Sequence, residues 1–181
     1  FYSTNLINAY LAAGYAIVAP DYEGLGSDGM HPFLHVASAG RSMVYATIAA
    51  RAENAQLSNQ WAAVGHSQGG QAALGAAEYA HEASDMIFVG SVAFAPASHL
   101  EEISEVWEEK VSDITNSVNT RATAATRVLV YAGWITFGMT AAIPNASPSD
   151  IYTEKGMPLY NKNIASCISD LSLWGDVYSA V

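Results

Sequence analysis

The segment Gly65-His66-Ser67-Gln68-Gly69 places a serine between two glycines in the pattern Gly-x-Ser-x-Gly. An apolar stretch enters this pattern and an alanine-rich stretch leaves it. A buried strand that turns sharply into a helix at a serine presents the hydroxyl as a nucleophile, and the flanking glycines leave room for the tight turn. We therefore predict that Ser67 is a nucleophile with a positive φ. An idle serine in a glycine-rich turn is the alternative, which these flanks disfavour.

A serine nucleophile needs groups that stabilise charge and move a proton. The backbone N–H of Gln68 is predicted to donate to an oxyanion, with added positive potential from the N-terminus of the following helix. The hydroxyl also needs a histidine base and an acid that orients this base, in the chain order serine, acid, histidine.

One set of residues keeps that order, namely Ser67, Asp85 and His99, because His81 lies far down the helix that leaves the serine. Asp85 and His99 flank a predicted strand of about ten residues, which would separate them by roughly 33 Å. Asp85 is then at the wrong end of the strand. We therefore expect the acid and the histidine of the triad to lie outside this chain.

The elements that must position Ser67 alternate between helices and strands. Helical spacing precedes Gly14, and a short apolar run at 15–20 predicts a strand buried on both faces. The further predictions are a helix at 36–54, a buried strand at 61–65, a helix at 69–81 and a strand at 86–95. This alternation predicts an α/β protein with a parallel sheet, flanking helices and right-handed crossovers, hence a partial α/β-hydrolase fold.

The chain changes character after residue 98. An apolar stripe with an acidic opposite face predicts a solvated helix beyond residue 100, and a second helix is expected from about Thr120. The uncharged stretch 128–149 has a core at Val128 to Ile143 that is interrupted by Gly133 and Gly138. This core has 16 residues, fewer than the roughly 20 that a membrane-spanning helix needs, so we expect a buried or substrate-facing helix. We predict two domains: residues 1–98 form the partial α/β-hydrolase core, and residues 99–181 form an incomplete helical lid or cap insertion.

Composition excludes several classes of function. The 181 residues are 51% hydrophobic and 13% charged, with a net charge of −10, which argues against nucleic-acid and anionic-membrane partners. Cys167 is the single cysteine, so neither a disulfide nor a cysteine-histidine metal cluster can be built, and a small buried hydrophobe is the better interpretation. No signal peptide is visible. We expect no metal and no cofactor.

Several segments resemble the secretory lipase family, which comprises α/β-hydrolases of fungi and actinobacteria. The matching segments are residues 14–26, 31–34, 40–42 and 61–70, and the close resemblance covers roughly residues 5–100. The resemblance implies that Ser67 is the nucleophile and that Gln68 supplies one oxyanion donor through its N–H. It also implies that a second donor lies upstream, before the first predicted helix, and that the acid and histidine follow the lid, so that all three lie outside this chain. This chain would then be an internal fragment, inactive by itself.

The resulting hypothesis is a secreted serine hydrolase, a lipase or esterase that cleaves acylglycerols or other apolar esters through an acyl-enzyme. Its partner would be a small acyl ester or lipid, with lipid-interface contact left open and no nucleic acid. A peptidase or an acyltransferase on the same fold remains an alternative, as does a non-catalytic hydrolase-like module if the chain is complete. The loop Asp21-Tyr22-Glu23-Gly24 has two interpretations: it lines the pocket, or it is a glycine turn anchored by buried carboxylates.

Overall fold

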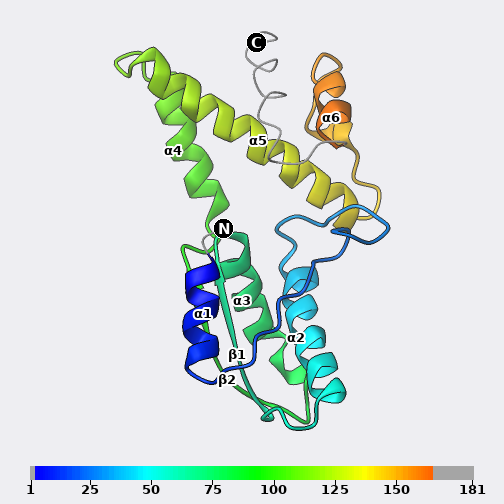
Figure 1. Ribbon diagram of the computed structural model, residues 1–181. Coiled ribbons are helices and arrows are strands. Elements are labelled where there is room, and N and C mark those ends of the chain that lie inside the picture. The colour runs from blue at the N-terminus through cyan, green and yellow to red at the C-terminus, as the bar shows by residue number, and fades with distance from the viewer. Residues whose placement is uncertain (1–2, 165–181) are drawn as a thin grey trace. The chain divides into compact units, whose positions relative to one another are not determined.

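A computed structural model describes residues 3–164 and combines six α-helices with a two-stranded parallel sheet (Figure 1). The described residues divide into two compact units, one of residues 3–28 and 36–97, the other of residues 29–35 and 98–164. Cys167, Asp170 and Asp176 lie outside the described residues. The two units are considered in turn.

The sheet of the first unit consists of β1 (Gln60–His66) and β2 (Ile87–Phe94), which run parallel. The register pairs Gln60 with Ile87 at one end and His66 with Phe94 at the other. The connection between the two strands consists of α3 (Gln68–Glu78) and the short 3-10 helix η1 (Ala80–Glu82). The predicted parallel pairing and the intervening helix are therefore confirmed for these two strands.

The strand predicted at residues 15–20 is wrong. This run follows α1 (Ser3–Ala12) and Gly14, which has a φ of 86°, but it forms no strand. Tyr15, Ile17 and Val18 remain 63%, 37% and 39% exposed. An apolar run becomes a buried parallel strand only when a neighbouring strand satisfies its backbone, and within the described residues β1 and β2 pair with each other alone.

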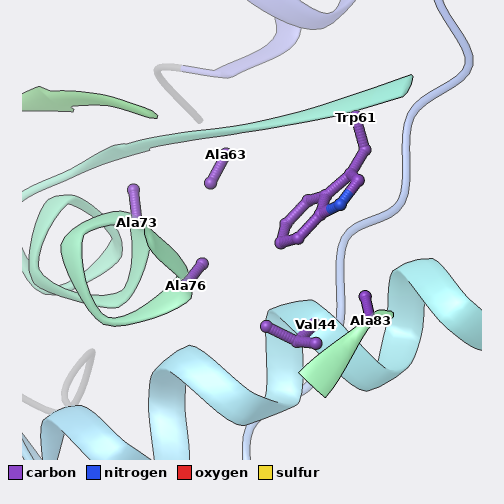
Figure 2. Packing of buried hydrophobic residues seen from close by; sticks show 6 residues of the cluster. All are labelled: Val44, Trp61, Ala63, Ala73, Ala76 and Ala83. Carbon is purple, nitrogen blue, oxygen red and sulfur yellow. The ribbon is translucent and has the colours of Figure 1, made fainter. Parts of the chain in front are cut away.

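The hydrophobic core of the first unit lies on one face of the sheet, beneath α2 (Val36–Glu53) and α3. Figure 2 shows the central cluster of Val44, Trp61, Ala63, Ala73, Ala76 and Ala83. Alternate residues of β1 belong to the opposite face, where Ala62 is exposed. The strand predicted to be buried at 61–65 is therefore buried on the face that α2 and α3 cover, through Trp61 and Ala63, and exposed at Ala62 on the other.

Two glycines allow α2 and α3 to pack at backbone distance. A Cβ on Gly40 would overlap the carbonyl carbon of Gly75 and would lie 2.8 Å from its Cα, and a Cβ on Gly75 would lie 2.7 Å from the carbonyl oxygen of Val36. Any larger residue at these positions forces the two helices apart. Figure 1 shows α2 and α3 side by side in this unit.

A polar cluster joins α2 to η1 at the opposite end of α3 from Ser67. The Arg41 guanidinium lies 2.9 Å from a carboxylate oxygen of Glu82 and 4.1 Å from the centre of the Tyr79 ring. The Tyr45 hydroxyl donates a hydrogen bond of 2.7 Å to the other Glu82 oxygen. These two donors, Tyr45 first and Arg41 second, hold the pKa of Glu82 below its ordinary value.

This cluster predicts a pH-dependent contribution to stability. A lowered folded-state pKa means that ionised Glu82 stabilises the fold above the pKa of the unfolded carboxyl, about 4.3, and that this contribution is lost as pH falls through the folded pKa. We expect Glu82→Gln to lower the thermal unfolding temperature at pH 7 and to approach wild type near pH 3. Melting curves at several pH values test this, with Glu53→Gln at the exposed end of α2 as the control. A deficit that does not change with pH would contradict the assignment.

The second unit contains α4 (Leu100–Ser112), α5 (Val118–Ala142), the 3-10 helix η2 (Pro148–Asp150) and α6 (Met157–Ile164). The side chain of Ser117 caps α5 by accepting from the N–H of Thr120, and the Arg121 side chain donates to the carbonyl of Val111 near the end of α4. Helices α4 and α5 form a hairpin (Figure 1). The predicted second helix is confirmed and begins two residues earlier, at Val118.

The apolar stripe predicted for α4 is only partly covered. Ile103, Trp107 and Val111 are half-buried, whereas Val106 is 48% exposed and Ile114, beyond the helix end, is 83% exposed. The acidic residues are all exposed, as predicted for a solvated face; they are Glu101, Glu102, Glu105, Glu108 and Glu109. Among residues 3–164, no helix combines the length and apolar character that crossing a bilayer requires.

Candidate active site

Ser67 lies between the last residue of β1 and the first residue of α3. Its φ is 57° and its ψ is −119°, a backbone conformation that residues other than glycine rarely adopt. The predicted positive φ at a turn from strand to helix is therefore confirmed. Such strained backbone persists only where the surroundings impose it.

The end of β2 imposes this conformation through hydrogen bonds to both backbone groups of Ser67. The Ser67 N–H donates to the Phe94 carbonyl over 3.0 Å, and the Ser67 carbonyl accepts from the N–H of Ala97 over 3.1 Å. The same carbonyl accepts the helical bond from the N–H of Gln71. The Ser67 side chain makes no capping bond to α3, and the residue is exposed. The hydroxyl is therefore accessible to a reactant.

Contacts between backbone segments require glycine at Gly65 and Gly70, whereas a Cβ on Gly69 would meet only the Tyr22 hydroxyl, at 3.9 Å. A Cβ on Gly65 would overlap the carbonyl group of Gly69 and would lie 2.8 Å from the nitrogen of Gly70. A Cβ on Gly70 would lie 3.0 Å from the Phe94 carbonyl oxygen and 3.0 Å from the Cα of Pro96. The backbone on either side of Ser67 is thus closely packed, and side chains at positions 65 and 70 would not fit.

Gln68 is the first residue of α3 and is half-buried. The amide groups of a first helical turn carry positive potential, so this end of α3 suits a developing negative charge. The exposed Ser67 hydroxyl and this helix end are two of the features that nucleophilic attack on a carbonyl requires. The part assigned to the Gln68 N–H stays a prediction.

Among the residues that it describes, the structure does not place a candidate acid or base at Ser67: Asp85 and His81 lie elsewhere in the first unit, and His99 belongs to the second unit. Asp85 precedes β2, whose far end contacts Ser67, so the length of a strand separates the two residues. The His81 ring in η1 lies 3.2 Å from the Glu78 carbonyl oxygen, at the opposite end of α3. The His99 ring lies 3.3 Å from the Ser98 hydroxyl in the second unit. His66 is exposed at the end of β1.

The loop after residue 20 contributes a side chain that sequence reasoning did not single out. Asp21 and Glu23 are exposed, so this glycine turn is not anchored by buried carboxylates, whereas Tyr22 is half-buried. The Tyr22 hydroxyl lies 3.9 Å from the position that a Cβ on Gly69 would occupy. Burial raises the pKa of Tyr22 above its ordinary value. The sequence signal that could have indicated a partly buried side chain here is an aromatic residue, Tyr22, within a polar turn that follows an apolar run.

The uncharged stretch of the second unit carries a series of aromatic contacts. Tyr131 stacks on Trp107 with ring centres 5.3 Å apart and meets Trp134 edge to face at 5.6 Å. Trp134 meets Phe33 at 5.2 Å, and the backbone of Phe33 packs against Gly138. This stretch is helical up to Ala142 and partly buried, as expected, while Tyr131 and Ile135 are each 36% exposed.

Within residues 3–164, no group of three or more histidine, cysteine, aspartate or glutamate side chains has the arrangement of a metal site. A comparison with protein families finds a match to the family described as secretory lipase over residues 2–125. This range contains β1, Ser67, α3 and β2. No curated protein and no solved structure matches the chain.

Proposed function

This chain belongs to the secretory lipase family, and we propose that it acts as a serine hydrolase that cleaves carboxylic esters through an acyl-enzyme on Ser67. The observation that carries the proposal is the backbone of Ser67, which has a φ of 57° between a parallel strand and the first turn of a helix. The exposed hydroxyl and the surrounding close contacts of Gly65 and Gly70 support it.

In the proposed reaction, the Ser67 oxygen attacks the acyl carbon of the ester while a histidine accepts the hydroxyl proton. The carbonyl oxygen becomes an oxyanion that accepts from the N–H of Gln68 and is stabilised by the N-terminal potential of α3. The intermediate collapses, the C–O bond to the alcohol breaks, and the histidine returns the proton to this alcohol. Water then hydrolyses the acyl-enzyme by the same steps.

We propose that the histidine and its orienting acid lie outside this chain. The position of Asp85, one strand length from Ser67, argues against the set Ser67, Asp85 and His99. The sheet is proposed to belong to an α/β-hydrolase fold, with residues 1–98 as its core and residues 99–181 as a lid or cap insertion. The parallel strands joined through α3 support this assignment.

The proposed substrates are acylglycerols or other apolar esters, and the proposed site of action is extracellular. The family description supports both points. The uncharged stretch 128–149 of the sequence suits an acyl chain better than a charged substrate. The net charge of −10 disfavours nucleic acid.

Two experiments on the full-length native protein test the proposal. A fluorophosphonate that reacts with activated serines should label Ser67, as located by mass spectrometry of the peptides, and should abolish ester hydrolysis. Turnover should be much faster with p-nitrophenyl butyrate than with the matched anilide. Faster cleavage of the anilide would favour a peptidase, and transfer of the acyl group to an added alcohol in place of water would favour an acyltransferase. Absence of both labelling and turnover would favour a binding module.

A further inference from the structure

Tyr22 lies against the helical turn that follows the proposed nucleophile. Gly69, whose Cβ position is 3.9 Å from the Tyr22 hydroxyl, is the second residue of α3 and is two residues beyond Ser67. The phenol is half-buried, whereas Ser67 is exposed. The hydroxyl group therefore lies beside the first turn of α3, which begins directly after the accessible serine.

The loop that carries Tyr22 is tied to the same framework as α3. The Tyr22 carbonyl accepts from the N–H of Leu25 over 2.9 Å, which closes a turn. The next side chain, Glu23, accepts a 2.6 Å hydrogen bond from the Ser38 hydroxyl on α2. Helix α2 in turn packs on α3 at backbone distance through Gly40 and Gly75, so the loop of Tyr22 is connected to α3 through α2.

We propose that Tyr22 is a further residue of the site and that its hydroxyl donates a hydrogen bond to the acyl group held at Ser67. This assignment rests on the proposed function. The site would then have two donors: the backbone N–H of Gln68, in the first turn of α3, and the side chain of Tyr22, which lies against this turn. A second donor aimed at the same developing charge stabilises the transition state more than the ground state.

The chemistry of a partly buried phenol suits this role. Burial raises the pKa of Tyr22, so the hydroxyl keeps its proton throughout the neutral and mildly alkaline range. A phenol that keeps its proton can donate a hydrogen bond, and it does not compete with the Ser67 hydroxyl for the histidine base. Tyr22→Phe removes the phenol oxygen atom and keeps the ring, so it tests the hydroxyl separately from the packing of the ring.

The test compares Tyr22→Phe with Tyr45→Phe in the full-length native protein. Tyr45 also loses a hydrogen-bonded hydroxyl, which contacts Glu82 at the other end of α3. With p-nitrophenyl butyrate, we expect Tyr22→Phe to lower kcat by about tenfold to hundredfold with little change in KM, the range for a hydrogen bond to a charged group. The kcat of Tyr45→Phe should stay within about twofold of wild type, because the hydrogen bond that it loses does not involve the reacting groups.

A second measurement remains informative if Tyr22→Phe folds poorly. Replacing Tyr22 by 3-fluorotyrosine keeps the hydroxyl and the ring but makes the phenol more acidic. If the protonated hydroxyl donates to the acyl group, the alkaline limb of the kcat profile must move to lower pH. A profile that superimposes on wild type would overturn the assignment.

The outcomes separate this inference from the proposed function. If fluorophosphonate labels Ser67 in the wild type and Tyr22→Phe turns over at the rate of Tyr45→Phe, Tyr22 is a packing residue and only the inference fails. If the wild type neither reacts at Ser67 nor hydrolyses the ester, both are overturned. Reduced kcat in Tyr22→Phe with intact labelling stoichiometry supports both.

Discussion

Replacing Ser67 by alanine is expected to lower kcat for ester hydrolysis in the full-length native protein by about 10⁶, because the loss of the nucleophile disables a triad as a unit. The fold should be unaffected. The Ser67 hydroxyl makes no capping bond to α3, and both backbone groups remain bonded to the end of β2. Alanine and serine each carry a Cβ, so the cost of a φ of 57° is similar for both.

The measurement combines steady-state kinetics with thermal unfolding and fluorophosphonate labelling. Ser42→Ala is a matched control, because it removes a hydroxyl that bonds to the Ser38 carbonyl within α2. We expect Ser42→Ala to keep both activity and labelling. If Ser67→Ala retained activity within tenfold of wild type, another residue would have to be the nucleophile.

The elements around Ser67 could be predicted because their signals are local. The glycine spacing, the apolar run before it and the alanines after it lie within one stretch of chain, and β1, Ser67 and α3 follow this order. The close approach of Gly65 to Gly69 belongs to this local pattern, whereas the hydrogen bonds that hold the backbone of Ser67 come from Phe94 and Ala97.

Residues 15–20 could not be predicted correctly because a parallel strand depends on a distant partner. The run Tyr15-Ala16-Ile17-Val18 has the composition of a buried strand, yet composition does not specify what lies beside it. Its exposed side chains show that β propensity alone does not bury a segment. Helices cover only one face of β1 for the same reason: the burial of a strand depends on segments that are distant in the sequence.

The placement of residues 29–35 with the second unit was equally beyond local patterns. These residues lie between α1 and α2 in sequence, but the Phe33 backbone packs on Gly138 and the Thr140 hydroxyl lies 3.3 Å from the Met30 sulfur. Gly133 and Gly138 interrupt an otherwise apolar helix, which indicates close approach by another segment. The sequence does not identify this segment, because the contact spans more than a hundred positions.

The second large effect is expected from adding one methyl group to the turn, as Gly65→Ala. The new Cβ would overlap the backbone of Gly69, so β1 and α3 must separate to admit it. Overpacking of this kind costs about 1–3 kcal/mol of stability. Because Ser67 links these two elements, the shift also changes the position of its hydroxyl relative to the Gln68 N–H, the proposed oxyanion donor. A displacement of about 1 Å in a catalytic geometry lowers the rate about a hundredfold.

Gly40→Ala separates the loss of activity from the loss of stability. Its Cβ would overlap the backbone of Gly75 at the crossing of α2 and α3, so a similar overpacking cost is expected there. The turn at Ser67 is not part of this contact. We therefore expect the two variants to unfold at similarly reduced temperatures, while kcat per fluorophosphonate-labelled site falls about a hundredfold more in Gly65→Ala. Equal activity per labelled site in the two variants would mean that the close approach of Gly65 and Gly69 serves the fold alone, and that the geometry of Ser67 tolerates the displacement.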